Sequence, residues 1–224
     1  MRNPFARSAP SSEEQAYRRL AQRGFAPDHV IDVGAYVGDW TRMIKRVFPQ
    51  ASVLMCEAQP EKAPRLEALC SEWPDVSLVS ALMGARSGEE LVFAEMETGS
   101  SIFPENSNVA RTTRTLTTRT LDETTVGCRG SCLLKIDVQG AELVVLEGAA
   151  RLLERCQVVQ LEVALLEYNR GAPSFLEVIR YMDARGFVPF DIAGATRPNH
   201  VDLVQVDLLF VPRLSALRPR FFEF

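Results

Sequence analysis

Short apolar runs alternate with amphipathic segments along most of the chain. The runs at 29–33, 52–57, 76–82, 132–138 and 157–163 have the length and the β-branched content of buried strands. Between these runs, apolar side chains recur every three or four positions, as they do on one face of a helix. Strands that alternate with helices predict a parallel sheet that is covered by helices on both faces.

Helix boundary signals separate these runs. Ser174 and Glu177 form a capping-box pattern before a helix that closes at Gly186. Further helices are expected from the serines and acids at 11–14 to about Gly24, from Gly38 to Pro49, after Pro60, and from about 141 onward.

No helix is expected between the last two strand-like runs, at 188–192 and 204–211. One of these strands is therefore predicted to enter the sheet antiparallel, with 193–203 as a long hairpin loop. An added strand is expected at 91–96, and the polar stretch 97–130 is a candidate lid.

A glycine turn follows the first strand and carries the pattern D-x-G-x-x-x-G over Asp32, Gly34 and Gly38. The dinucleotide fingerprint G-x-G-x-x-G fails, because Tyr36 and Asp39 stand where its later glycines belong. The phosphate loop fails too, since Gly38 is not followed by lysine. Asp39 at the mouth of the helix disfavours a pyrophosphate and suits a cationic ligand such as S-adenosylmethionine. A turn that only packs strand against helix is the simpler alternative.

Four acids fall at predicted carboxyl ends of strands, where open α/β sheets bind their ligands: Asp32, Glu57, Asp137 and Glu162. Glu57 closes the second strand and can accept hydrogen bonds from both hydroxyls of a ribose. Each acid, taken alone, could also be a solvated carboxylate at a strand end. Glu142 differs, because an acid in the first turn of a helix stabilises that helix without any further role.

The composition is that of an ordinary globular enzyme. The 224 residues carry a net charge of −4, with 46% hydrophobic and 24% charged residues, which argues against a general nucleic-acid binder. No apolar run is long enough for a membrane span, and no apolar segment typical of a signal peptide follows the first residues. The five cysteines form no C-x-x-C pair and are expected to be reduced thiols of a cytoplasmic protein.

One segment is specific enough to carry a family resemblance. The run LLKIDVQGAE at 133–142, with LEGA at 146–149 behind it, resembles the signature of the FkbM-type family of S-adenosylmethionine-dependent methyltransferases. Further matching segments lie at 31–35, 56–60, 120–123 and 205–207, and the resemblance extends over about 29–211.

The resemblance implies an α/β fold, a Rossmann-like seven-stranded and mostly parallel sheet whose last strand is antiparallel. It divides the chain into an N-terminal polar segment with a short helix at 1–28, a methyltransferase domain at 29–211 and a C-terminal tail at 212–224. The implied activity is O-methylation of a hydroxyl on a sugar or natural-product small molecule. Homo-oligomerisation stays open.

Roles for individual residues also come from the resemblance. Asp32, Gly34 and Gly38 would shape the methionine side of the cofactor pocket, and Asp137 would lie beside the methyl donor or the acceptor. The remaining cofactor residues are Glu57 with Ala58 at the ribose, and Ser80 with Ala81 at the adenine.

Transfer to a hydroxyl also requires removal of its proton. Asp137 is the first candidate for the base and His200 the second. As a less favoured alternative, Asp137 and Glu162 would hold a divalent cation such as Mg²⁺ that lowers the acceptor pKa. The candidate acceptor contacts are Ser100, Ser101, Glu162 and Tyr168.

Two other functions compete with a methyltransferase. A non-catalytic S-adenosylmethionine-binding module, regulatory or scaffolding, would keep the donor pocket and block the acceptor cleft. A nicotinamide-dependent oxidoreductase is disfavoured by the failed dinucleotide fingerprint.

Overall fold

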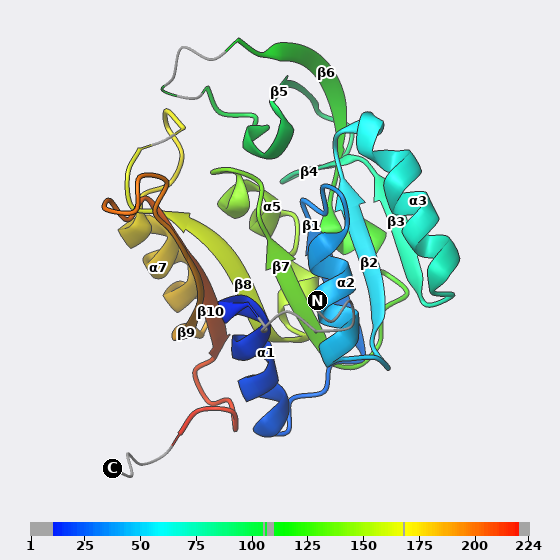
Figure 1. Ribbon diagram of the computed structural model, residues 1–224, viewed down its shortest axis with the longest axis vertical. Helices are drawn as coiled ribbons and strands as arrows, with labels where there is room; N and C mark the ends of the chain where they lie inside the picture. The colour runs from blue at the N-terminus through cyan, green and yellow to red at the C-terminus, as the bar shows by residue number, and fades with distance from the viewer. Residues whose placement is uncertain (1–10, 105, 107–109, 168, 220–224) are drawn as a thin grey trace, which may run out of the picture.

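A seven-stranded sheet in the order β3-β2-β1-β7-β8-β10-β9 forms the centre of the molecule (Figure 1). The computed structural model describes residues 11–104, 106, 110–167 and 169–219. The strands are β1 His29–Val33, β2 Ser52–Glu57, β3 Val76–Ser80, β7 Cys132–Ile136, β8 Cys156–Ala164, β9 Phe187–Thr196 and β10 Gln205–Pro212. The predicted Rossmann-like fold is confirmed.

Strand direction also follows the prediction. β3, β2, β1, β7 and β8 run parallel, whereas β10 pairs antiparallel with both β8 and β9. The predicted hairpin loop at 193–203 is too long, because β9 continues to Thr196 and pairs with Gln205 of β10. The carboxyl ends of the five parallel strands therefore share one edge of the sheet.

Helices cover both faces, and each face has its own apolar core. The described helices are α1 Ser12–Gln22, α2 Asp39–Val47, α3 Ala63–Glu72, α4 Leu121–Thr124, α5 Glu142–Glu147, α6 Ala150–Leu153 and α7 Phe175–Ala184. The core on one face contains side chains of α1, α2 and α3, and the core on the other contains side chains of α4, α5, α6 and α7. None of the described helices is long and apolar enough to cross a membrane.

The apolar runs form buried strands because successive side chains point to opposite faces. In β1, Val30 enters the core beneath α1 and α2, and Ile31 and Val33 enter the other core. The predicted capping box is present, since the Ser174 hydroxyl accepts from Glu177 N–H and the Glu177 carboxylate accepts from Ser174 N–H.

A second, three-stranded sheet lies beyond the carboxyl edge of the first. It has the order β4-β6-β5, with β4 Leu82–Met83, β5 Glu90–Glu95 and β6 Thr112–Arg119. The predicted strand at 76–82 is divided, because the chain leaves the main sheet after Ser80 and pairs with β6. Figure 1 shows β5 and β6 arching above the ends of β1 and β7.

A buried ion pair joins two adjacent strands at the centre of the sheet. Asp32 of β1 and Lys135 of β7 are cross-strand neighbours, and Lys135 Nζ lies 3.1 Å from Asp32 Oδ1. The Thr41 hydroxyl donates to the other carboxylate oxygen at 2.7 Å. Burial alone lowers the pKa of Lys135, but the carboxylates of Asp32 and Asp137 outweigh burial and raise this pKa. Lys135 is therefore charged at neutral pH.

We predict that Lys135→Met lowers the free energy of unfolding by about 3–5 kcal/mol, because it leaves the fully buried Asp32 carboxylate without its cation. Adding Asp32→Asn should restore most of that loss. Arg213→Met, which breaks the exposed pair with Asp183, should cost at most about 1 kcal/mol. Urea unfolding of the three variants measures this, and equal losses for Lys135→Met and Arg213→Met would contradict it.

Candidate functional site

A cavity of about 500 Å³ lies at the carboxyl edge of the central strands. Its wall is formed by the β1–α2 turn, the end of β2, the turn 96–100 and the loop that follows β7. Thr196, Pro198 and Gln205, from the β9–β10 hairpin, line its far end. The β1–α2 turn, the end of β2 and the loop after β7 belong to the edge of the sheet where the strand-end acids were predicted.

The glycines of the first turn have a packing role. Gly34 has φ 77°, and a Cβ there would collide with the main-chain oxygen of Asp137. Gly38 has φ 82° at the N-cap of α2, where a Cβ would lie 2.6 Å from Leu69 Cδ2. A positive φ is also costly for residues with a Cβ, so both the backbone conformation and the close contact favour glycine at these positions. Gly34 lines the cavity and Gly38 does not.

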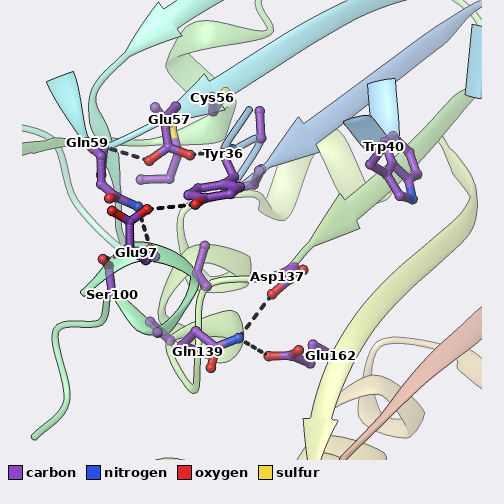
Figure 2. A pocket seen from close by; sticks show the side chains of 18 of the residues that line it. Tyr36, Trp40, Cys56, Glu57, Gln59, Glu97, Ser100, Asp137, Gln139 and Glu162 are labelled. Atoms are coloured by element: carbon purple, nitrogen blue, oxygen red, sulfur yellow. Dashed lines mark hydrogen bonds between the residues drawn. The ribbon is translucent and has the colours of Figure 1, made fainter. Parts of the chain in front are cut away.

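Glu57 lies at the end of β2 and is held by main-chain donors. Tyr36 N–H donates to Glu57 Oε2 at 2.7 Å, and Gln59 N–H donates to Oε1 at 2.8 Å. Burial raises the pKa of Glu57, and these two hydrogen bonds act in the opposite direction. The carboxylate is therefore fixed in orientation on the cavity wall (Figure 2).

The turn 97–99, the short 3₁₀ helix η2 Glu97–Gly99, closes this end of the cavity. Glu97 Oε2 accepts from the Tyr36 hydroxyl at 2.7 Å and lies 2.7 Å from Lys62 Nζ. Gln59 Nε2 donates to the main-chain oxygen of Glu97 at 3.0 Å (Figure 2). The start of the predicted lid region 97–130 thus contacts the β1–α2 turn and the end of β2 directly.

Lys135 and Asp137 line the cavity at the end of β7, between Glu57 of β2 and the β9–β10 hairpin. Lys135 Nζ donates to the main-chain oxygen of Gly34 at 2.9 Å and lies 3.7 Å from Asp137 Oδ2. The Asp137 side chain is 38% exposed and lines the cavity. A carboxylate beside a fixed cation, open to the cavity, can accept a proton from a bound molecule.

Gln139 connects two carboxylates. It adopts φ 53°, and its Nε2 donates to Asp137 Oδ1 at 3.4 Å and to Glu162 Oε2 at 2.6 Å (Figure 2). Gln205 Nε2 donates to the other oxygen of Glu162. Burial, followed by the charge of Asp137, raises the pKa of Glu162 well above its ordinary value.

The structure brings seven of the predicted site residues to one cavity. They are Gly34, Glu57, Ala58, Ala81, Ser100, Asp137 and Glu162. The cavity is also lined by Lys135, Tyr36, Gln139 and Glu97, for which the sequence predicted no role. Tyr36 lies between Gly34 and Gly38, and Gln139 precedes Gly140, but nothing in the sequence indicates which partners their side chains contact.

Five predicted residues do not line this cavity: Asp32, Gly38, Ser80, Ser101 and His200. Asp32 is enclosed with Lys135 and Thr41, so it can influence a ligand only through them. The buried Ser101 hydroxyl donates to the main-chain oxygen of Gln139 at 2.7 Å. His200 is exposed in the β9–β10 turn, and Tyr168 lies outside the described residues.

The described residues contain no cluster of three or more histidine, cysteine or acidic side chains that could hold a metal ion. Asp137 and Glu162, the pair predicted as alternative cation ligands, have the Gln139 amide between them.

A family model matches residues 32–189, and its description is methyltransferase FkbM domain. No curated protein matches the chain by sequence. The structure of cofactor-bound Rv0187 from MTB is similar with a TM-score of 0.53 at 13% identity, over 94% of this chain and 83% of that one. Magnesium protoporphyrin IX methyltransferase (ChlM) from Synechocystis PCC 6803 with bound SAM has a TM-score of 0.51 at 10% identity, over 90% and 78%.

EvdMO1 has a TM-score of 0.50 at 14% identity over 91% of this chain, which spans only 42% of the EvdMO1 chain. At such low identities these likenesses show a shared fold.

A buried acid lies just behind this site. Glu142 begins α5, and its Oε1 accepts from Val138 N–H and Gly140 N–H, each at 3.1 Å. Glu142 is 3% exposed, and burial raises its pKa from 4.5 to about 7 despite these hydrogen bonds.

A carboxyl group whose pKa is higher in the folded state binds its proton more tightly there, so it contributes stability below the unfolded pKa. We predict that this contribution is lost as pH rises from 4.5 through about 7. Glu142→Gln does not titrate, so its free energy of unfolding relative to the unmodified protein should rise by up to roughly 3 kcal/mol between pH 4.5 and 8. Urea unfolding at several pH values measures the difference, and a pH-independent difference would contradict the assignment.

Proposed function

Because the chain belongs to the FkbM methyltransferase family, we propose that it transfers the methyl group of S-adenosylmethionine to a hydroxyl of a sugar or natural-product small molecule. The observation that carries this proposal is that one cavity contains both Glu57, at the end of β2, and Asp137, just after β7. A ribose at Glu57 and an acceptor hydroxyl at Asp137 require a cofactor that spans this cavity.

The charge of the cavity supports a cationic cofactor. Its described lining contains the acids Asp39, Glu57, Glu97, Asp137 and Glu162, and Lys135 is its single basic residue. Lys135 is already paired with Asp32. An excess of carboxylates attracts a sulfonium and an ammonium and repels a diphosphate, so a nicotinamide dinucleotide is the poorer candidate.

The end of the cavity beyond Asp137 supports catalysis over cofactor binding alone. A non-catalytic module would have this end blocked, whereas here the cavity continues past Asp137 to Pro198 and Gln205. This end is the place for the acceptor.

The proposed reaction needs few groups. The acceptor oxygen attacks the methyl carbon in line with the bond to sulfur, that bond breaks, and S-adenosylhomocysteine leaves. Holding the two molecules in this geometry supplies much of the rate. Asp137 takes the hydroxyl proton, because its carboxylate lines the cavity where the acceptor would bind, and Lys135 Nζ lies 3.7 Å from its Oδ2.

We predict that Asp137→Asn lowers turnover about 10²–10⁴-fold, the usual contribution of a general base, and changes S-adenosylhomocysteine affinity much less. The assay incubates the protein with S-adenosylmethionine and a fractionated metabolite extract, and mass spectrometry follows products that are heavier by one methyl group. Asp183→Asn is the matched control and should keep full turnover, because Asp183 is exposed on α7 and does not line the cavity. A fully active Asp137→Asn protein would remove Asp137 as the base.

A further inference from the structure

A second cavity of about 240 Å³ adjoins the first at the carboxyl end of β8. Gln139, Glu162 and Gln205 line both cavities, so one row of side chains separates them. The second cavity extends from this row to the segment 163–167 and to the beginning of α7. A group bound there would lie next to the acceptor end of the first cavity.

Asn169 presents an unpaired acceptor in this second cavity. Asn169 is 4% exposed, and its Nδ2 donates to the main-chain oxygen of Gln139 at 2.6 Å. Its Oδ1 is buried and has no hydrogen-bond partner among the residues that the structure describes. A buried acceptor without a donor is unfavourable, so Oδ1 is a place for a donor that a ligand brings.

The charges around Asn169 specify the kind of donor. Glu142, Glu162 and Glu167 line the cavity, and its described lining contains no lysine, arginine or histidine. The rest of the wall is largely apolar, with side chains such as Leu165, Phe175 and Val178. Burial raises the pKa of Glu142 and Glu162, and a cation beside them favours their ionised form. Several oxygen acceptors, these carboxyl groups and an apolar wall together fit a cation carried on a hydrocarbon frame.

From this lining we infer that the second cavity binds a protonated amine of the methyl acceptor, with Asn169 Oδ1 and Glu162 as its hydrogen-bond acceptors. The inference rests on the proposed methyltransferase function and narrows its substrate class to an amino alcohol or an amino sugar. An ammonium has no free electron pair, so the amine is recognised while a neighbouring hydroxyl is methylated.

Calorimetry on the protein saturated with S-adenosylhomocysteine tests this inference with two probes of matched shape, cyclohexylamine and cyclohexanol. We expect the amine, which is protonated at neutral pH, to bind at least about tenfold more tightly than the alcohol, as a charged hydrogen bond in a buried site would give. Equal affinities, tighter binding of the alcohol, or no binding of either probe would overturn the inference.

Two variants distinguish a role of Asn169 in binding the amine from its role as a hydrogen-bond donor to the main-chain oxygen of Gln139. Asn169→Leu and Ser101→Ala each remove one donor to that carbonyl, but only Asn169→Leu removes an acceptor from the second cavity. We expect Asn169→Leu to lose the preference for the amine and Ser101→Ala to retain it. Loss of the preference in both variants would assign it to Gln139 instead and overturn the role of Asn169.

The same titrations distinguish this inference from the proposed function. If S-adenosylhomocysteine does not bind at all, the proposed function fails, and the two probes are then titrated into the free protein. If S-adenosylhomocysteine binds but the amine shows no preference, only the amine site fails.

Discussion

The buried ion pair between Asp32 and Lys135 is the interaction on which the rest of the site depends. It connects β1 to β7 inside the sheet, where both side chains are buried. Lys135 also donates to the main-chain oxygen of Gly34, so the same ammonium holds the glycine turn against the end of β7. Leaving either charge unpaired at this depth would cost several kcal/mol. The ion pair therefore stabilises one arrangement of the β1–α2 turn, β7 and Asp137.

That arrangement divides the carboxyl edge of the sheet into two parts. At one end, the main-chain N–H groups of Tyr36 and Gln59 hold the Glu57 carboxylate. The Glu97 carboxylate there accepts from the Tyr36 hydroxyl and pairs with Lys62. At the other end, amide side chains hold the carboxylates of Asp137 and Glu162, and the amide donors come from the loop after β7 and from β10. Both parts are acidic, and we propose the first for the nucleoside and the second for the acceptor.

The sequence predicted the parts of this structure that depend on local pattern. The apolar runs predicted the sheet, and Glu57 and Asp137 were expected on one edge because parallel strands end together. β6 was not predicted, because its threonines and arginines are mostly exposed and leave no apolar period. Contacts between distant segments, such as Glu97 with Tyr36 or Asn169 with Gln139, follow from how the loops pack, which a single sequence does not encode in any local signal.

Calorimetric titration with S-adenosylhomocysteine and, separately, with NAD tests most directly whether the cavity binds an S-adenosyl nucleoside, rather than a dinucleotide, through Glu57. We expect S-adenosylhomocysteine to bind and NAD not to bind. Glu57→Gln should weaken the binding of S-adenosylhomocysteine by about 1–3 kcal/mol, because the ribose contacts are lost. Glu61→Gln should leave this affinity unchanged, since the Glu61 carboxylate pairs with Arg114 outside the cavity. Heat with NAD only, or equal affinities for S-adenosylhomocysteine in both variants, would contradict these expectations.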